Sequence, residues 1–132
     1  MTLTCRDQAA LWVGESGDPI QAAVMYQSLL ADMTERSHSR REEVFHTRSM
    51  VARSRTQGGD YDSPLRDWDQ LISEAASIYG RLQSNSFYLR VQHAWCVGES
   101  GDAQRAVRLL QDTLADATEL GDRGLFTLLY VR

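Results

Sequence analysis

The sequence contains no lysine, so all fourteen of its basic residues are arginines. It has only two cysteines and two prolines, and none of its apolar runs approaches the length of a membrane-spanning helix. Cys5 and Cys96 lie 91 positions apart, which argues against a disulfide scaffold and favours a reducing compartment. The N-terminus also lacks the apolar core of a signal peptide. These absences predict a soluble, cytoplasmic protein.

The charge balance is mixed, with a formal net charge of -4. A balance of this kind argues against a general nucleic-acid or membrane-surface binder. One basic cluster exists, but three glutamates offset it, which favours a solvated turn: Arg36, His38, Arg40 and Arg41 stand among Glu35, Glu42 and Glu43. We expect neither a nucleic acid nor a membrane among the partners.

A short motif recurs along the chain. Val-Gly-Glu-Ser-Gly-Asp occupies residues 13–18 and returns unchanged at 97–102, with a weaker copy around Gly59-Asp60. The three Gly-Asp pairs are 42 residues apart. The same step separates two further sets of identical residues, namely Arg6, Arg48, Arg90 and Arg132, and Ala10, Ala52 and Ala94. A strict period of this length predicts a repeat architecture.

Each copy has the pattern of a helix hairpin. Apolar residues at helical spacing precede and follow the turn, Gly17 suits a helix C-terminus, and Asp18 suits a helix N-cap. In the second copy the turn is longer, and we expect Ser63 to cap a helix with Pro64 in its first turn. The predicted buried stripes include Trp12, Tyr26, Leu30, Trp68, Ile72, Leu110 and Leu114.

The spacing of these residues resembles a known repeat. Residues 6–18, 48–60 and 90–102 each read Arg, then Ala, then Gly-Asp, and copies one and three add an Ala four positions later. The pattern resembles the tetratricopeptide repeat, in the 42-residue variant of kinesin light chains and many actinobacterial repeat proteins. The resemblance implies one all-α domain over residues 1–132, a right-handed α-solenoid of three helix-turn-helix repeats (about 1–38, 39–82 and 83–122) and a short C-terminal helix from a partial fourth repeat (123–132).

The resemblance also implies a concave groove, lined by the first helix of each hairpin, that binds a peptide or a protein segment. The groove positions are Thr4, Asp7, Leu11, His46, Ser49, Arg53, Tyr88, Val91, Trp95 and Tyr130. Tyrosine, tryptophan and arginine are the residue types enriched at binding hot spots. The alternative is that Tyr88 and Trp95 simply pack between neighbouring helices.

The arginines at the repeat period have two interpretations. They could clamp acidic groups of a ligand, or each could pair with an acid on a neighbouring helix, such as Asp32 or Glu74. Recurrence in every repeat favours the structural pairing.

No residue pattern predicts catalysis, a cofactor or a metal site. The three histidines fall in different elements without ligand spacing, and the Gly-rich turns follow helices instead of strands, so they are not phosphate loops. Asp60 and Asp62 lack the remainder of a calcium-binding loop.

The C-terminal end is unusually apolar. Its counterparts in the earlier repeats are mostly polar, whereas this end carries Leu125, Phe126, Leu128, Leu129 and Val131. A terminal repeat needs a polar outer face for solubility. We therefore expect something to cover these residues: a second copy of the chain in a homo-oligomer, a partner, or further repeats of a longer protein.

These features favour a non-catalytic protein–protein interaction module. One alternative is a sensor or regulatory segment of a larger signalling ATPase or transcription regulator. Another is a small-molecule binder or an unusual biosynthetic enzyme, whose site would lie among Tyr88, Trp95, His46 and Arg53. A deep, closed pocket with a buried titratable pair would favour the last alternative, and an open groove would count against it.

Overall fold

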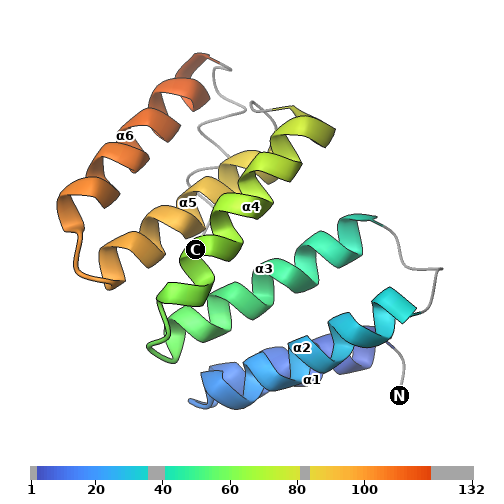
Figure 1. The fold of residues 1–132 in the computed structure, drawn as a ribbon. Coiled ribbons are helices and arrows are strands. Elements are labelled where there is room, and N and C mark those ends of the chain that lie inside the picture. The colour runs from blue at the N-terminus through green and yellow to red at the C-terminus, as the bar shows by residue number, and fades with distance from the viewer. Residues whose placement is uncertain (1–2, 36–40, 81–83, 120–132) are drawn as a thin grey trace. The chain divides into compact units, whose positions relative to one another are not determined.

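The computed structural model describes residues 3–35, 41–80 and 84–119. This part of the chain forms six helices and no strand (Figure 1): α1 (Leu3–Glu15), α2 (Pro19–Glu35), α3 (Arg41–Gln57), α4 (Asp62–Tyr79), α5 (Ser84–Glu99) and α6 (Ala103–Glu119). The predicted all-α class is confirmed, and the packing of adjacent helices is consistent with an α-solenoid. The right-handed sense stays a prediction. No described helix combines the length and the apolar character needed to cross a membrane.

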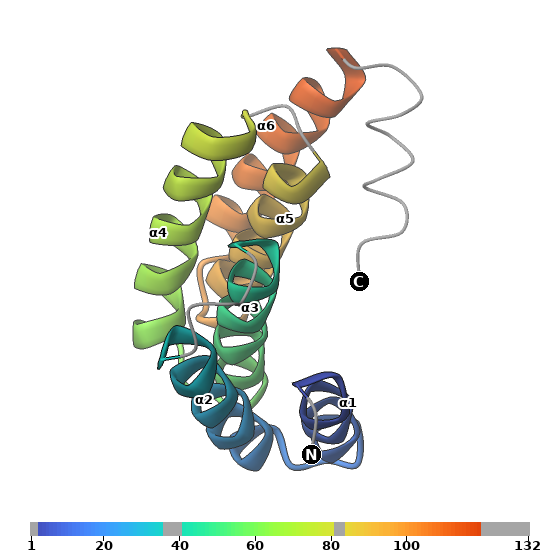
Figure 2. The same cartoon turned by 90° about the vertical axis from the view of Figure 1, so that its right-hand side faces the viewer.

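The chain divides into two compact units, Met1–Asp67 and Trp68–Arg132, which are described separately. The first contains α1, α2, α3 and the first residues of α4, and the second contains the remainder of α4 with α5 and α6. Within the first unit α2 packs against both α1 and α3, and within the second α5 packs against α6 (Figures 1 and 2).

A Schellman motif ends α1. The backbone N–H of Asp18 donates to the carbonyl of Val13 (3.2 Å), and that of Gly17 donates to the carbonyl of Gly14 (3.1 Å). Gly17 has a φ of +105°, which a residue with a Cβ adopts only with strain. Asp18 then caps α2, because its Oδ1 accepts a hydrogen bond from the N–H of Gln21 (3.0 Å). The predicted turn and cap are confirmed.

The turn between α5 and α6 repeats this geometry. The N–H of Asp102 donates to the carbonyl of Val97 (3.2 Å), and that of Gly101 donates to the carbonyl of Gly98 (3.1 Å). Asp102 caps α6 through the N–H of Arg105 (3.1 Å). Identical sequence has therefore produced the same backbone in two separate units.

Small residues let the two helices of these hairpins approach closely. A Cβ atom added to Gly14 would lie 3.3 Å from the Cβ of Ala22. A Cβ atom added to Gly98 would likewise lie 3.4 Å from the Cβ of Ala106. The Gly-to-Ala contact explains why both residues recur in copies one and three.

The turn between α3 and α4 keeps only part of the geometry of the turn between α1 and α2. Asp60 donates its N–H to the carbonyl of Arg55 (2.9 Å), and Gly59 donates to the carbonyl of Thr56 (3.1 Å), so the Schellman pattern is kept. Thr56 stands where the other hairpins have the close-contact glycine, and its Oγ1 donates to the carbonyl of Ala52 (2.9 Å).

The start of α4 differs from the sequence prediction. The helix begins at Asp62, and the carbonyl of Tyr61 accepts the first backbone hydrogen bond, from Leu65 (3.1 Å). The prediction of Ser63 as the cap is therefore wrong. Its hydroxyl accepts a hydrogen bond from Nη1 of Arg55 instead (2.9 Å), which holds the longer turn against α3.

Each unit has its own buried side chains. In the first, one core cluster joins α1, α2 and α3 through Ala10, Ala22, Tyr26, Met50 and Val51. In the second, the large buried side chains are Trp68, Leu71, Phe87 and Val97. Tyr26 and Trp68, which share one column of the repeat, were predicted to be buried, and both are.

Three predicted core residues are exposed instead. Trp12 on α1 is 67% exposed, and Leu110 and Leu114 on α6 are 42% and 49% exposed. The prediction failed because a helical stripe is buried only where a neighbouring helix covers it. The equivalents of Leu110 and Leu114 on α2 are Tyr26 and Leu30, and α2 is packed against α3.

Candidate functional site

Two of the arginines at the repeat period pair with an aspartate on the following helix. Arg6 on α1 pairs with Asp32 on α2, and Arg90 on α5 pairs with Asp116 on α6 at 2.8 Å. The Arg90 guanidinium also lies over the ring of Phe87, 5.9 Å from its centroid. The favoured structural interpretation is confirmed for these two pairs, and Arg132 lies outside the described residues.

Two predicted groove residues meet between α1 and α3. Nε2 of His46 lies 3.3 Å from Oδ1 of Asp7, although 39 positions separate them in the sequence. The His46 side chain is 55% exposed and that of Asp7 is 26% exposed. The pair therefore lies at an open surface and can meet a ligand.

A pocket of about 560 Å³ surrounds this pair. Its walls come from α1, α2 and α3, and its lining residues are Leu3, Thr4, Asp7, Leu29, Met33, Glu42, Glu43, His46 and Thr47. Three carboxylates stand beside three aliphatic side chains. The pocket is thus suited to a group with a positive charge and an apolar stem.

The remaining groove positions of the first unit are less open. Leu11 and Arg53 line the same crevice between α1 and α3, but its cavity is only about 10 Å³ and admits no ligand group. Ser49 is 2% exposed, and its hydroxyl donates to the carbonyl of His46 (2.7 Å). Its assignment to the groove is therefore corrected, because a buried hydroxyl bonded to its own helix cannot meet a ligand.

The groove positions of the second unit lie on one helix. Tyr88, Val91 and Trp95 are partly exposed and share a face of α5, since they are spaced by three and four residues. Their part in binding stays a prediction. Tyr130 and the predicted self-association residues Leu125, Phe126, Leu128, Leu129 and Val131 lie outside the described residues.

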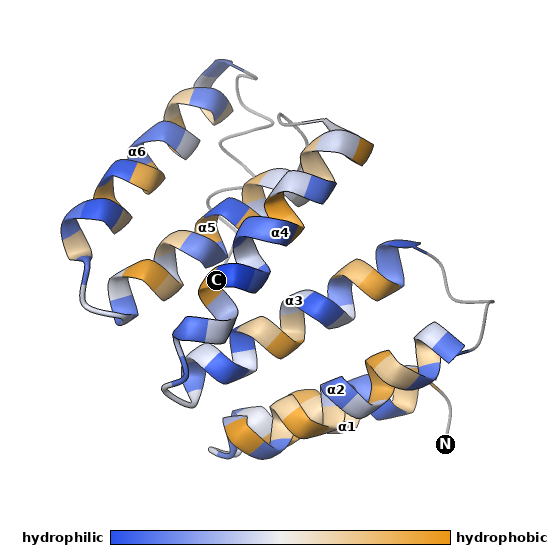
Figure 3. Ribbon diagram, in the orientation of Figure 1, coloured by the Kyte–Doolittle hydropathy of each residue, from blue (hydrophilic) through white to orange (hydrophobic). Residues whose placement is uncertain are grey.

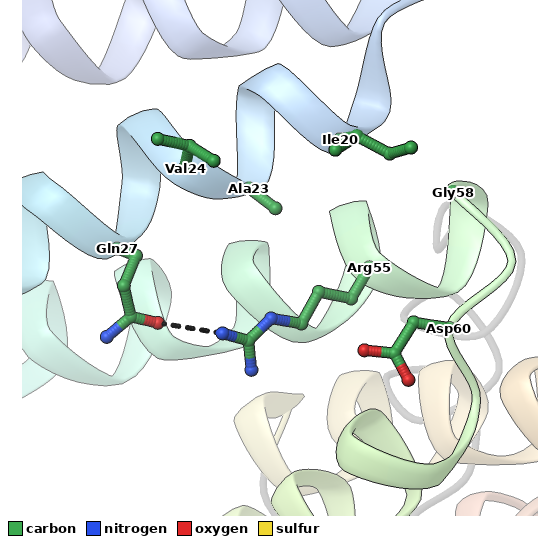
Figure 4. Close-up of a pocket in the computed structure, with 7 residues that line it drawn as sticks. All are labelled: Ile20, Ala23, Val24, Gln27, Arg55, Gly58 and Asp60. Carbon is green, nitrogen blue, oxygen red and sulfur yellow. Dashed lines mark hydrogen bonds between the residues drawn. The ribbon is translucent and has the colours of Figure 1, made fainter.

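A second pocket, of about 440 Å³, lies between α2 and α3 (Figure 4). Ile20, Ala23 and Val24 form its apolar side, and Arg55 extends across it to Gln27, with 3.3 Å from Nη2 to Oε1. Arg55 also contacts Ser63, so its charge is already engaged. We regard this pocket as part of the α2–α3 packing surface.

A buried histidine stands apart from both pockets. His93 on α5 is 6% exposed, and its Nε2 lies 3.5 Å from Oδ1 of Asp69 on α4. Burial lowers the pKa of His93 below its ordinary value of 6.5; Asp69 opposes this shift, and Arg105 adds to it. The neutral imidazole is favoured, and the side chain serves the packing of α5.

Metal binding by clustered side chains finds no support in the described residues. They contain no group of three or more His, Cys, Asp or Glu side chains arranged to hold a metal ion. Cys5 is exposed, Cys96 is buried, and neither forms a disulfide bond.

Sequence reasoning found Asp7 and His46 but missed several of their neighbours. Glu42, Glu43 and Met33 line the pocket, yet the sequence assigned the first two to a polar turn and the third to a buried stripe. The signal that could have found Glu42 and Glu43 is their spacing from His46, which they precede by four and three residues on the same helix.

No family model, curated protein or solved structure matches this chain.

Proposed function

We propose that the chain is a tetratricopeptide-like, non-catalytic module that binds a peptide or a protein segment along its first helices. The carrying observation is the pocket at Asp7 and His46, where α1 and α3 present predicted groove residues to one cavity. The occupant that this pocket favours is an arginine or lysine side chain of the bound segment. Its charged end would meet the carboxylates, and its aliphatic stem would lie on Leu3, a partly exposed aliphatic residue of the lining.

The exposure of the pair supports a peptide over a small molecule. A small-molecule or catalytic site encloses most of its ligand and shifts the pKa of its titratable groups by burial. His46 is more than half exposed, and the cavity opens beside the ends of two helices. A side chain of an extended segment can enter such a cavity while the rest of the segment follows the surface.

A phage-displayed library of random eight-residue peptides tests the proposal. Selection on the intact chain should enrich sequences with arginine or lysine, and affinities should then be measured by fluorescence anisotropy at two salt concentrations. The double variant Asp7→Asn/Glu42→Gln should bind a selected peptide at least tenfold more weakly, since it removes two carboxylates. Higher salt should also weaken binding to the unchanged chain.

The matched control is Asp112→Asn, which removes one exposed carboxylate from α6 and lines neither pocket. It should leave the affinity unchanged. Selection of uncharged or acidic peptides, or equal affinity in the double variant, would count against the proposed occupant. Failure to select any peptide at all would count against the function itself.

A further inference from the structure

The pair formed by Asp7 and His46 contains an acceptor that lacks a donor. Oδ1 of Asp7 is buried and accepts no hydrogen bond among the described residues, although Nε2 of His46 lies 3.3 Å away. A buried polar atom without a hydrogen-bond partner costs free energy. A group that brings an N–H and a positive charge to this oxygen would remove that cost.

The neutral form of His46 meets this need only in part. A neutral imidazole carries one hydrogen on either of its two nitrogens, so Nε2 can be an acceptor as well as a donor. A protonated imidazole donates from both nitrogens and carries a positive charge. Protonation of His46 therefore gives Oδ1 of Asp7 a donor and a counter-charge together. Histidine is also the side chain whose charge most readily changes near neutral pH.

The charged residues that line the cavity with His46 are all acidic. Glu42 and Glu43 precede His46 by four and three residues, so they lie on the same side of α3. Figure 3 shows the first turn of α3, which contains both glutamates, as hydrophilic, and much of α2 as hydrophobic. The α2 residues in the described lining are uncharged, and the charged lining residue from α1 is Asp7. A proton on His46 thus adds a single positive charge among three carboxylates.

A bound basic side chain would use the same carboxylates. In the peptide complex proposed above, the charged end of that side chain meets Asp7 and the glutamates of the pocket. A protonated His46 would pair with Asp7 and would repel a second cation within the same cavity of about 560 Å³. The proton and the basic side chain therefore compete, and each weakens the binding of the other by the same factor.

We propose that protonation of His46 releases a basic side chain from this pocket. The inference rests on the proposed function, because it needs a cationic occupant. Its sign follows from the charges: as the pH falls, His46 gains a proton, pairs with Asp7 and weakens binding. Because the His46 side chain is 55% exposed, solvent screens its charge, and we expect the affinity to fall only about fivefold between pH 7.5 and pH 5.5.

An NMR titration of the intact chain with N-acetyl-arginine amide tests the proposal. This probe carries one guanidinium, which keeps its charge at both pH values, so the probe itself does not titrate. Amide signals of α1 and α3 should shift on binding, and the dissociation constant should be about five times larger at pH 5.5 than at pH 7.5. N-acetyl-citrulline amide has a similar shape without the charge and should bind at neither pH. Circular dichroism should show the chain folded at both.

Two substitutions fix the charge at this position. His46→Gln cannot take up a proton, so its dissociation constant should be the same at pH 7.5 and pH 5.5. His46→Arg keeps a positive charge beside Asp7, so it should bind the probe weakly at both. The side chain is more than half exposed, so both variants should fold like the unchanged chain. The matched control is His93→Val, which removes a buried histidine outside the described lining and should keep the pH dependence.

The outcomes distinguish this inference from the function on which it rests. Absence of probe binding at both pH values would contradict a basic side chain as the occupant, and it would overturn the regulation as well. Equal affinity at the two pH values would overturn the role of His46 alone. A loss of affinity that persists in His46→Gln would do the same, because the carboxylates would then cause the pH dependence.

Discussion

The hairpins α1–α2 and α5–α6 have the same turn and the same arginine–aspartate pair, but their surroundings differ. In the first hairpin, Arg6 and Asp32 are 25% and 41% exposed. In the third, Arg90 and Asp116 are only 13% and 18% exposed. Conversely, α3 packs against α2, whereas Leu110 and Leu114, the equivalents of Tyr26 and Leu30 on α6, are exposed. The repeat therefore determines local geometry, and the neighbouring elements determine burial.

The turn between α3 and α4 shows how a change within the repeat motif alters local geometry. Gly59 in this turn keeps a positive φ of 90°, so the Schellman motif at the end of α3 is preserved. Its aspartate, Asp60, no longer stands immediately before a helix, because α4 begins at Asp62. A longer turn has thus separated the two tasks that a single residue performs at Asp18 and Asp102. The ending of one helix and the capping of the next can change independently.

The largest expected difference concerns the two ion pairs. Asp116→Asn should lower the free energy of unfolding by about 2 kcal/mol, because it leaves the mostly buried Arg90 without its counter-charge. Asp32→Asn should cost only about 0.5 kcal/mol, because solvent screens the more exposed pair with Arg6. Urea unfolding followed by circular dichroism would measure both values.

The double variants serve as controls for this comparison. Replacing Arg90 with methionine in the Asp116→Asn background should cost less than the two single changes added together, because the pair is removed as a unit. Equal losses at Asp32 and Asp116 would show that the difference in burial has no energetic consequence.

A smaller effect is expected at the caps. Asp18→Ala and Asp102→Ala should each cost about 1 kcal/mol, because each removes the acceptor of a backbone N–H at a helix start. Asp60→Ala should cost clearly less, since α4 begins two residues later. Thermal unfolding of the three variants would order them, and a loss at Asp60 equal to that at Asp18 would contradict the separation of the two tasks.

Much of the fold could be predicted from the sequence because its information is local and repeated. The Gly-Asp turns and the pairing of Arg6 with Asp32 both follow from residues spaced at fixed steps. The start of α4 was missed because Tyr61 contributes its backbone carbonyl to the helix start, which a search for capping side chains overlooks. Backbone acceptors leave no trace in residue identity.

The site could be predicted only in part, for a different reason. Helical spacing placed Asp7 and His46 on one side of their helices, and the repeat step brought these helices together. The same spacing placed Ser49 there, yet Ser49 is buried, because its small side chain stays close to its own helix backbone. Exposure depends on the neighbouring helix, and this dependence also explains why Trp12 and Leu110 were expected in the core.

The last comparison contrasts one position in three first helices. Ala9, Val51 and His93 occupy equivalent places on α1, α3 and α5, and only the third can titrate. Because burial lowers the pKa of His93 in the folded state, the unfolded chain binds a proton more readily there. The contribution to stability is therefore complete above the ordinary pKa of 6.5 and is lost as the pH falls below it.

The melting temperature of the unchanged chain should therefore decrease between pH 7.5 and pH 5.5, and His93→Val should decrease less over the same range. Valine is the matched replacement, because it is the α3 residue at this position and is itself buried there. The carboxylate of Asp69 and the guanidinium of Arg105 act on His93 from α4 and α6. Parallel pH profiles for the two proteins would show that His93 is equally easy to protonate in the folded and unfolded chains, and burial would then have no effect on its charge.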